Sequence, residues 1–550
     1  MDGNDDECSR ADENSDRGAA MILPPAVRRE AFSAALQGFA NVVGDEWVFS
    51  KDEDVALYND AYTPFFGEPD KQHVASAAVA PAEVEQVQQI VRIANKYRIP
   101  LYTISTGRNL GYGGSSPNYS GSVVLDLKRM SRIIEVNTDE GYMIVEPGVS
   151  FIDLQRHFDE HQIEYVPSSP QPGWGSPIGN GLDHGIGGAY GDNFSAVAGL
   201  EVVLANGEVL RTGRGALPDS RLWACYHYGF GPYIDGMFSQ SNFGVVTKAC
   251  FWLKPKWEVS QSFTISSDSD NDMQPMIDAL KELRNHEVIN GFGVGSPIRQ
   301  SMATNDGRRP FGIPEVNTLL RQRDGGTSAQ WEALAQKSQL PVVEAGGSAR
   351  GPAPIVKAQL DYALAFLQQR NVPGTVVLGK PSNKIKPPSI DFGELALSGT
   401  SHGHYYFSPI FKQTRDDIFA INDTIRNVML DAGDFEMLEE TGWWASRGFG
   451  GGGAGRDKHM LLLMEFRVYD DVAKNRRRRQ LFLDLVKACG EKGWGEYRAP
   501  VAFHDQVMDQ FSFNHHILRR FCETIYDALD PNGILSPGKN GVWPRHLRKT

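Results

Sequence analysis

A glycine-rich segment at residues 104–114 is the first part of the chain that could hold a ligand through its main chain. It follows a predicted strand and carries four glycines within the eight residues from 107 to 114. Glycine lets the main chain approach a bound group closely, and successive N–H groups in such a loop can surround a pyrophosphate. The segment lacks both the Gly-Lys-Ser/Thr of a Walker loop and the GxGxxG of a Rossmann fold. An ordinary tight turn therefore stays open as the alternative.

A second segment of the same kind spans residues 171–188 and is rich in glycine, proline and serine. It belongs to a longer stretch, residues 167–193, that shows almost no periodicity, and loops of that length are usually functional. Two such loops, each next to a predicted buried strand, indicate one extended dinucleotide held by main-chain donors. The pair is a more specific signal than either segment alone.

The elements expected to position these loops begin with a strand, a helix and a second strand. Residues 75–81 predict a short buried strand, and Pro81 starts a helix with apolar residues at helical spacing. A strand at 101–105 follows, so the order fits a right-handed crossover unit. The sequence after it is rich in β-strand patterns, with a strand at 122–127 and hairpins at 132–146 and 200–212.

Composition places the chain among soluble proteins with more than one domain. It has 550 residues, 41% apolar and 22% charged, and its net charge of −13 argues against nucleic acid or a membrane surface as partner. It has no run of 18 apolar residues, which a membrane-spanning helix would need. The five cysteines are odd in number and form no CxxC pair, so we expect no disulfide framework, no metal site and a cytoplasmic location. The basic run at 476–479 lies in a helical pattern and predicts a solvated helix face.

The character of the sequence changes near residue 257, which predicts a domain boundary. The first 30 residues are acidic and predict a disordered tail, and residues 31–257 form the first predicted domain. Residues 258–494 carry longer helical patterns broken by Pro and Gly, so we predict a second domain of mixed α+β type. The sequence from 495 to 550 returns to short elements.

Several motifs together resemble one known family. They are the loop at 105–114, GLEVVLANGE at 199–208, GFGPYIDGMFSQSNFG at 229–244 and DPNGILSPGKNG at 530–541. They are similar to the vanillyl-alcohol oxidase family, in particular its 4-phenol-oxidising branch with eugenol oxidase and p-cresol methylhydroxylase. The resemblance is strong over residues 45–257, good over 400–545 and weak over 258–395.

The resemblance implies an α+β fold of two domains. An FAD-binding domain of the p-cresol methylhydroxylase type would include residues 495–550 as a C-terminal return, and residues 258–494 would form a cap over the substrate pocket. The implied activity is oxidation of para-substituted phenols by hydride transfer from the benzylic carbon to flavin N5 through a p-quinone methide, with O2 reduced to H2O2. A cytochrome-linked hydroxylase or dehydrogenase, a carbohydrate or hydroxy-acid oxidase, and a flavin protein without catalysis stay open as alternatives.

The resemblance also assigns the residues that contact FAD. His404 stands four residues before Ser408-Pro409, where the family attaches flavin covalently through its C8α methyl. Taken alone, a histidine among aromatics is more often a satisfied core residue. The other expected FAD contacts are Thr103, Ser105, Thr106, Gly107, Arg108, Asn109, Gly175, Ser176, Gly179, Asn180, Gly191, Asp192, Glu201, Val246 and Lys539.

Tyr112, Tyr497 and Arg498 are the residues that the resemblance places around the substrate oxygen. Two phenol donors and a guanidinium would lower the pKa of a bound phenol, so that phenolate binds. In the family's oxidases an aspartate near flavin N5 acts as a base, and Gln171 stands at that position here. Glutamine cannot take a proton usefully at neutral pH, so water addition would need another base or would be slower. The methylhydroxylase members also lack that aspartate.

Two further departures from the family concern the pocket and the assembly. The family's tyrosine loop is shortened at residues 188–191, and residues 439–455 are unlike the family, which predicts a reshaped pocket for a bulkier phenol. Glu394 is a weak match to a carboxylate near the family's active site. The segment after Pro218, which joins dimers into octamers in some members, is short here, so we predict a homodimer.

Overall fold

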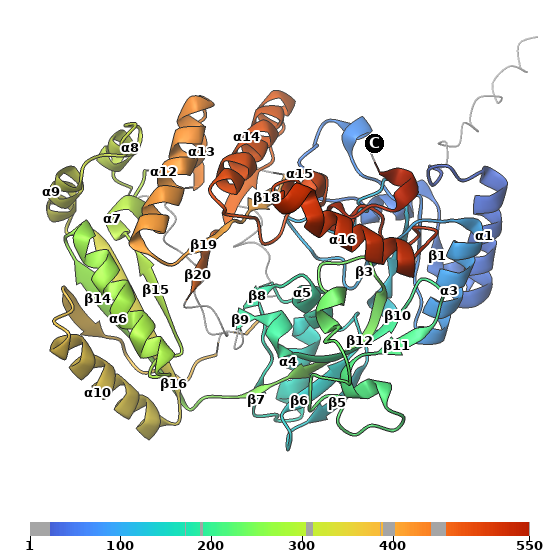
Figure 1. Cartoon of the computed structure of the whole chain (residues 1–550), viewed down its shortest axis with the longest axis horizontal. Coiled ribbons are helices and arrows are strands. Elements are labelled where there is room, and N and C mark those ends of the chain that lie inside the picture. Colours follow the sequence, from blue (N-terminus) through green and yellow to red (C-terminus); the bar gives the residue numbers. More distant parts are fainter. Residues whose placement is uncertain are drawn as a thin grey trace, which may run out of the picture.

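The computed structural model describes residues 22–170, 172–187, 191–303, 312–385, 387–388, 402–441 and 458–548. Figure 1 shows two lobes, one holding the blue-to-green first half of the chain with the red helix α16 (Phe513–Leu529), the other holding most of the yellow-green and orange middle. The tail predicted at 1–30 lies mostly outside the described residues. Its predicted end overlaps the start of α1 (Arg29–Val43). The mixture of helices and sheets confirms the predicted α+β class.

The first sheet confirms the predicted strand, helix and strand. β2 (Ala77–Val79) and β3 (Leu101–Ile104) both run parallel to β4 (Val123–Asp126), and α3 (Val84–Tyr97) connects β2 to β3. The apolar stripe of α3 packs with α1 against one face of the sheet. The strand order is β1 (Val48–Phe49), β2, β4 and β3.

The second sheet is antiparallel and contains both predicted hairpins. Its order is β11 (Val209–Arg211), β10 (Val197–Val203), β12 (Val245–Trp252), β6 (Tyr142–Val145) and β5 (Ile133–Asn137). Short helices and strand pairs lie beside it: α4 (Phe151–Glu160), α5 (Pro177–Leu182), β7 (Tyr165–Val166) with β13 (Lys254–Pro255), and β8 (Ile186–Gly187) with β9 (Gly191–Asp192). Ser150 and Asp153 form a capping box that fixes the start of α4.

The end of the chain returns to the first sheet and packs against its strand β3. After α15 (His504–Met508) and α16 (Phe513–Leu529), the Leu101 N–H donates to the Ile534 carbonyl at 2.7 Å. The Ser536 N–H donates to the Leu101 carbonyl, also at 2.7 Å. The C-terminal segment therefore lies beside the glycine-rich loop that follows β3.

The other lobe is built on a four-stranded antiparallel sheet in the order β15 (Gly291–Gly295), β16 (Val343–Gly351), β14 (Val259–Ser267) and β17 (Thr375–Leu378). Two more strand pairs are β18 (His404–Phe407) with β21 (Met464–Arg467), and β19 (Ile410–Lys412) with β20 (His459–Leu461). Its described helices are α6 (Met273–Asn285), α7 (Pro297–Gln300), α8 (Pro314–Leu320), α9 (Ser328–Ser338), α10 (Ala353–Gln369), α12 (Arg415–Asp431), α13 (Glu436–Thr441) and α14 (Val472–Glu491).

One hydrophobic core runs through this lobe from Phe263 to Val507 and so includes residues past the domain boundary predicted at 494. The predicted domain limits themselves stay a prediction. Within the described residues, the structure contains no helix that combines the length and the apolar character needed to cross a membrane.

The basic run in α14 is a solvated helix face only at Arg476 and Arg477, and that prediction was wrong for the other two arginines. Arg478 is 1% exposed and Arg479 is 8% exposed. Arg479 pairs with Glu68, and Nε of Arg478 lies 3.1 Å from a carboxylate oxygen of Asp434. Buried guanidinium groups need such partners because an uncompensated charge is costly inside a protein. α14 therefore connects the second lobe to the segment around Glu68 in the first.

A buried ion pair in the second lobe provides a test of its stability. The two Nη atoms of Arg299 donate to the two carboxylate oxygens of Asp270, both at 2.6 Å, and both side chains are buried. Asp270→Asn should lower the free energy of unfolding by about 3–5 kcal/mol, because it leaves a buried guanidinium uncompensated. Urea unfolding followed by circular dichroism measures this change.

Asp416→Asn is the matched control, because Asp416 makes only a surface pair with Arg415 at 3.5 Å. It should change the stability by less than about 1 kcal/mol. Equal stabilities for the two variants would show that the Asp270 pair contributes no more than a surface pair.

Candidate active site

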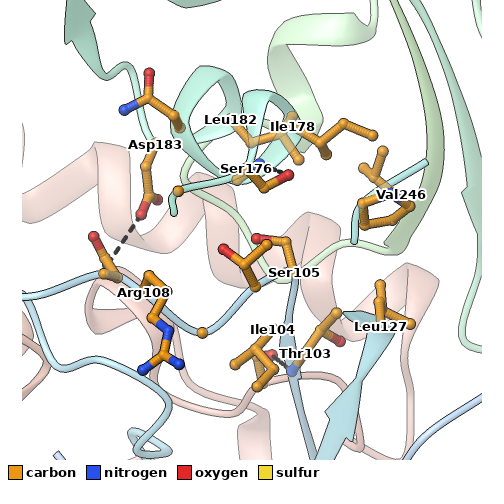
Figure 2. Close-up of a pocket in the computed structure, with 18 of the residues that line it drawn as sticks. Thr103, Ile104, Ser105, Arg108, Leu127, Ser176, Ile178, Leu182, Asp183 and Val246 are labelled. Carbon is orange, nitrogen blue, oxygen red and sulfur yellow. Dashed lines mark hydrogen bonds between the residues drawn. The ribbon is translucent and has the colours of Figure 1, made fainter. Parts of the chain in front are cut away.

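Two loops from opposite sides of a pocket bring the predicted cofactor-binding residues together. The first loop, residues 102–109, includes the last residues of β3 and the turn after them, and the second loop, residues 175–183, contains α5. Figure 2 shows Ser105 and Ser176 facing each other from the two loops, with Leu127 and Val246 on one side and Arg108 and Asp183 on the other. The predicted FAD contacts that line this pocket are Thr103, Ser105, Thr106, Gly107, Arg108, Asn109, Gly175, Ser176, Gly179, Asn180, Val246 and Lys539.

Glycine is required where the two loops meet. A Cβ on Gly179 would lie 2.3 Å from the hydroxyl oxygen of Ser105. Gly107 has a φ of +66°, and a Cβ there would lie 2.3 Å from the hydroxyl oxygen of Ser115. The glycines thus allow the first loop its turn and its close approach to the second.

The remaining predicted FAD contacts lie at other positions. Gly191 and Asp192 form β9, where Asp192 accepts a hydrogen bond from the Phe194 N–H at 3.1 Å. Glu201 is buried in β10, and its carboxylate accepts from Lys248 at 2.6 Å and from Arg211 at 2.8 Å. The Glu201 carboxylate is therefore engaged by two cations of the second sheet.

Tyr112 and Tyr497, almost 400 residues apart in the chain, both contact Arg498, which lines the pocket. The guanidinium carbon of Arg498 lies 4.1 Å from the centroid of the Tyr112 ring, and its Nη1 donates to the Tyr497 hydroxyl at 3.4 Å. Arg498 also donates to the side-chain oxygen of Asn109 in the first loop. Two phenols and a guanidinium in one place can bind and stabilise an oxyanion.

Tyr112 is held by burial and by a neighbouring hydroxyl. Its Oη lies 3.1 Å from Oγ of Ser408, and its ring lies 5.2 Å from the ring of Tyr406. Burial raises the pKa of Tyr112 well above its ordinary value. Tyr112 therefore keeps its proton at neutral pH and is able to donate a hydrogen bond.

His404 lies next to this cluster, at the start of β18. It is 5% exposed, and its ring lies 4.6 Å from that of Tyr406 and 5.2 Å from that of Tyr62. Burial lowers the pKa of His404 to about 4, so its imidazole is neutral at physiological pH. By contrast, the His402 side chain is 39% exposed, stacks on Phe66 and pairs with an aspartate.

Comparison with known proteins identifies the family. Residues 75–213 match a protein-family model described as an FAD binding domain. Over 539 residues the chain is 30% identical to the 4-cresol dehydrogenase (hydroxylating) flavoprotein subunit of Pseudomonas putida. The match covers 95% of this chain and 98% of that protein. The chain belongs to the vanillyl-alcohol oxidase family. As a member of this family it is an FAD-dependent oxidoreductase.

Two solved structures of vanillyl-alcohol oxidase family members share the whole fold. The 4-ethylphenol oxidase from Gulosibacter chungangensis, in complex with isoeugenol, is 29% identical with a TM-score of 0.75, and the match covers 96% of this chain and 100% of that one. p-Cresol methylhydroxylase with bound substrate is 27% identical with a TM-score of 0.77, covering 95% and 99%. These matches confirm the family resemblance and the two-domain FAD-binding fold predicted from the motifs.

The residues in the pocket fit FAD, the cofactor of the vanillyl-alcohol oxidase family. The hydroxyl groups of Ser105, Thr106 and Ser176, together with the ammonium of Lys539, form a donor set suited to a pyrophosphate. On the side of the second loop, Gly175 and Gly179 line the cavity with main chain alone, beside the side chains of Ser176 and Ile178.

Asp183 is a site residue that the sequence analysis missed, although it lies within the second glycine-rich segment, residues 171–188. It accepts a hydrogen bond from the Asn109 side chain at 3.3 Å, and Nη2 of Arg498 lies 3.6 Å from it. Burial alone would raise the pKa of Asp183, but the charges of Lys539 and Arg498 outweigh burial and hold that pKa below its usual value. Asp183 thus remains ionised and balances the charge of Arg498 beside the pocket.

Several positions that set this chain apart from other members of the vanillyl-alcohol oxidase family lie outside the described residues. They are Gln171, most of the shortened loop at 188–191, Glu394 and most of the segment 439–455. Glu439, at the start of that segment, is buried and pairs with Arg321 at 2.5 Å. The predictions about the missing base and the reshaped pocket therefore stay predictions.

Gly111 provides a test of how the first glycine-rich segment supports the aromatic cluster. Its φ is +79°, and a Cβ there would lie 2.7 Å from two ring atoms of Tyr406 and 3.4 Å from the His404 ring. Gly111→Ala should therefore lower the free energy of unfolding by about 2 kcal/mol and reduce activity, because the strained turn pushes Tyr406 out of place. Chemical unfolding and steady-state turnover measure the two effects.

Gly236→Ala is the control for this substitution, because a Cβ at Gly236 meets no heavy atom within 4 Å and its φ lies outside the left-handed range. It should leave both stability and turnover close to wild type. If Gly111→Ala behaved in the same way, the contact between Gly111 and Tyr406 would have no role in shaping the site.

Proposed function

We propose that this protein oxidises para-substituted phenols at the benzylic carbon, with 4-alkylphenols or 4-hydroxybenzyl alcohols as substrates. The observation that supports the proposal is the convergence of Tyr112, Tyr497 and Arg498 beside the FAD pocket and next to His404. The relatives named 4-cresol dehydrogenase and 4-ethylphenol oxidase are consistent with a phenolic substrate.

The first task of the site is to bind the substrate as phenolate. Arg498 supplies a fixed positive charge, and the hydroxyl groups of Tyr112 and Tyr497 donate to the substrate oxygen. These interactions favour the charged form, so the substrate's phenol loses its proton below its solution pKa. The negative charge spreads into the ring and weakens the C–H bond at the para benzylic carbon.

Bound FAD would supply the hydride acceptor, at its N5 position. Once the benzylic hydride leaves, the phenolate becomes a neutral p-quinone methide, and water adding to its benzylic carbon gives an alcohol. A second oxidation of that alcohol gives an aldehyde or a ketone. Because Gln171 cannot accept the proton of the attacking water, we expect this hydration to use another base or to be slower than in members with the aspartate.

FAD would be held by the two loops, Lys539 and Val246, and attached covalently through His404. The neutral, buried imidazole of His404 has a nitrogen lone pair available for such a bond. A covalent histidyl link raises the reduction potential of a flavin, which would help it accept hydride from the benzylic carbon.

The test is anaerobic mixing of purified protein with 4-ethylphenol while the flavin absorbance is recorded. Loss of the oxidised flavin band is expected with 4-ethylphenol but not with 4-ethylanisole, whose methylated oxygen cannot become a phenolate. If p-cresol, 4-ethylphenol and vanillyl alcohol all leave the flavin oxidised, the proposed function is wrong.

The electron acceptor is proposed to be O2, with a cytochrome as the second candidate because one relative is a dehydrogenase flavoprotein subunit. Substrate-dependent oxygen uptake with an equal yield of H2O2 supports the oxidase, whereas turnover with only a cytochrome or an artificial acceptor supports the dehydrogenase. The expected homodimer is checked by light scattering coupled to gel filtration.

A further inference from the structure

Ser408 joins the two tyrosines of the site from a position between β18 and β19. It is fully buried, and its Oγ lies 3.1 Å from the Tyr112 hydroxyl oxygen. Its carbonyl accepts a hydrogen bond from the Tyr497 N–H at 3.1 Å, and its own N–H donates to Oε2 of Glu496 at 2.5 Å. One residue thus contacts both parts of the chain that carry the phenol groups.

The direction of the Ser408–Tyr112 hydrogen bond decides what Tyr112 can do. A phenol has one proton, so a Tyr112 that donates to Ser408 has none left for a bound substrate. A Tyr112 that accepts from Ser408 can direct its proton to the substrate oxygen. A hydrogen bond received by Tyr112 also polarises the one it donates, because chains of hydrogen bonds strengthen one another in a buried site.

The Ser408 N–H donates to a carboxyl group whose uncharged form is favoured by its surroundings. Burial raises the pKa of Glu496 well above its usual range, which disfavours a negative charge beside the phenols. The other ionisable groups that face Tyr112 are Tyr406, Tyr497 and Arg498. Among these groups only Arg498 is a cation, and its charge favours a phenolate.

We propose that Ser408 is a positioning residue whose hydroxyl donates a hydrogen bond to the Tyr112 hydroxyl. Tyr112 can then direct its own hydrogen bond to the substrate phenolate. The inference rests on the proposed phenol oxidation. It adds a specific cause for the preference for phenolate: the Ser408 hydroxyl, which acts through Tyr112 and does not itself touch the substrate.

Ser408→Ala removes only the hydroxyl group and leaves both main-chain hydrogen bonds in place. The probe is 4-hydroxybenzaldehyde, whose phenol and phenolate forms differ in near-ultraviolet absorbance, titrated with pH on the flavin-loaded protein. Wild type should bind the phenolate below the pH at which the free compound ionises. The variant should lose about tenfold of this preference, as expected for one hydrogen bond to a charged group.

A double-mutant cycle with Tyr112→Phe makes the result specific. If Ser408 acts through Tyr112, the variant with both substitutions should lose no more phenolate preference than Tyr112→Phe alone. If the double variant instead loses the product of the two single-variant losses of phenolate preference, the proposal is overturned. Ser122→Ala is the matched control, because Ser122 is an equally buried serine that donates to the Tyr119 carbonyl away from the site.

The outcomes separate this inference from the proposed function. Ionisation of the bound aldehyde at its solution pKa in wild type would refute phenolate binding itself. A lowered pKa in wild type that is unchanged in Ser408→Ala would refute only the role of Ser408. If Ser408→Ala loses its flavin, Ser408→Cys replaces the hydroxyl with a weaker donor, and an unchanged titration in that variant also refutes the role.

Discussion

Replacing Arg498 with alanine should lower kcat/KM for 4-ethylphenol by about 100- to 1000-fold, the usual cost of removing one preorganised group that stabilises developing negative charge. Arg498 is the cation placed between the two phenols, and its guanidinium lies over the Tyr112 ring. Without it, the bound phenol keeps its proton at neutral pH and its ring stays a poor hydride donor. Stopped-flow reduction of the flavin under anaerobic conditions measures the effect.

The pH dependence distinguishes this role from simple disruption of the site. If Arg498 acts by lowering the substrate's pKa, the loss should be smaller near pH 10, where free phenols ionise without help. Arg498→Lys keeps the charge but loses the planar donor fork, and should show a loss of about tenfold. Rates are compared per bound flavin, because Arg498 also contacts Asn109 and Asp183 of the FAD pocket.

A control variant removes a similar arginine from a different place. Arg350 is half-buried over the Trp257 ring in the second lobe, far along the chain from the pocket residues. Arg350→Ala should retain the wild-type rate of flavin reduction. A loss in Arg498→Ala that is equal at every pH would contradict the role in phenol ionisation.

The second large effect is expected at His404, where alanine should abolish covalent attachment of FAD. After denaturing electrophoresis the wild-type band should fluoresce as a flavin, and the His404→Ala band should not. His402→Ala is the matched control, because His402 is only two residues before His404 but is exposed and stacks on Phe66. Fluorescence retained by His404→Ala, or lost in His402→Ala, would place the attachment elsewhere.

The low pKa of His404 gives this attachment a pH signature. Since burial lowers its pKa to about 4, the imidazole remains neutral well below the pH at which an ordinary histidine takes up a proton. The yield of covalent flavin from apoprotein and FAD should therefore be the same at about pH 6 as at pH 8. A yield that halves near pH 6.5 would indicate an exposed histidine as the attachment site.

Local signals in the sequence predicted the elements that hold the FAD site. The helix α3 follows from the helical spacing of apolar residues that starts at Val84, and the hairpin of β10 and β11 follows from the Asn206-Gly207 turn. Both signals come from residues that are close in sequence, and both elements are present in the structure. The family motifs added the pairing of Tyr112 with Arg498, which no local pattern could give. That pairing depends on the C-terminal sequence returning to the first lobe.

Residues whose partners come from distant segments could not be assigned from spacing alone. Arg479 looked like part of a solvated helix face because its partner Glu68 lies more than 400 residues earlier in the chain. Glu201 carries a carboxylate at the predicted position, but Lys248 on the adjacent strand engages it within the sheet. Ser408 served only as a landmark for counting to His404, and its contact with Tyr112 depends on how β18 packs against the first lobe.

The position of the C-terminal segment has a consequence for how the enzyme matures. Ile534 and Ser536 complete the hydrogen bonds of Leu101, and Lys539 lines the FAD pocket. While these residues are still inside the ribosome, the nascent chain has no finished dinucleotide site, even though both glycine-rich loops have emerged. Cofactor loading must therefore wait until residues 534–539 have emerged, and a truncation before Ile534 would remove part of the dinucleotide site while both loops are still present.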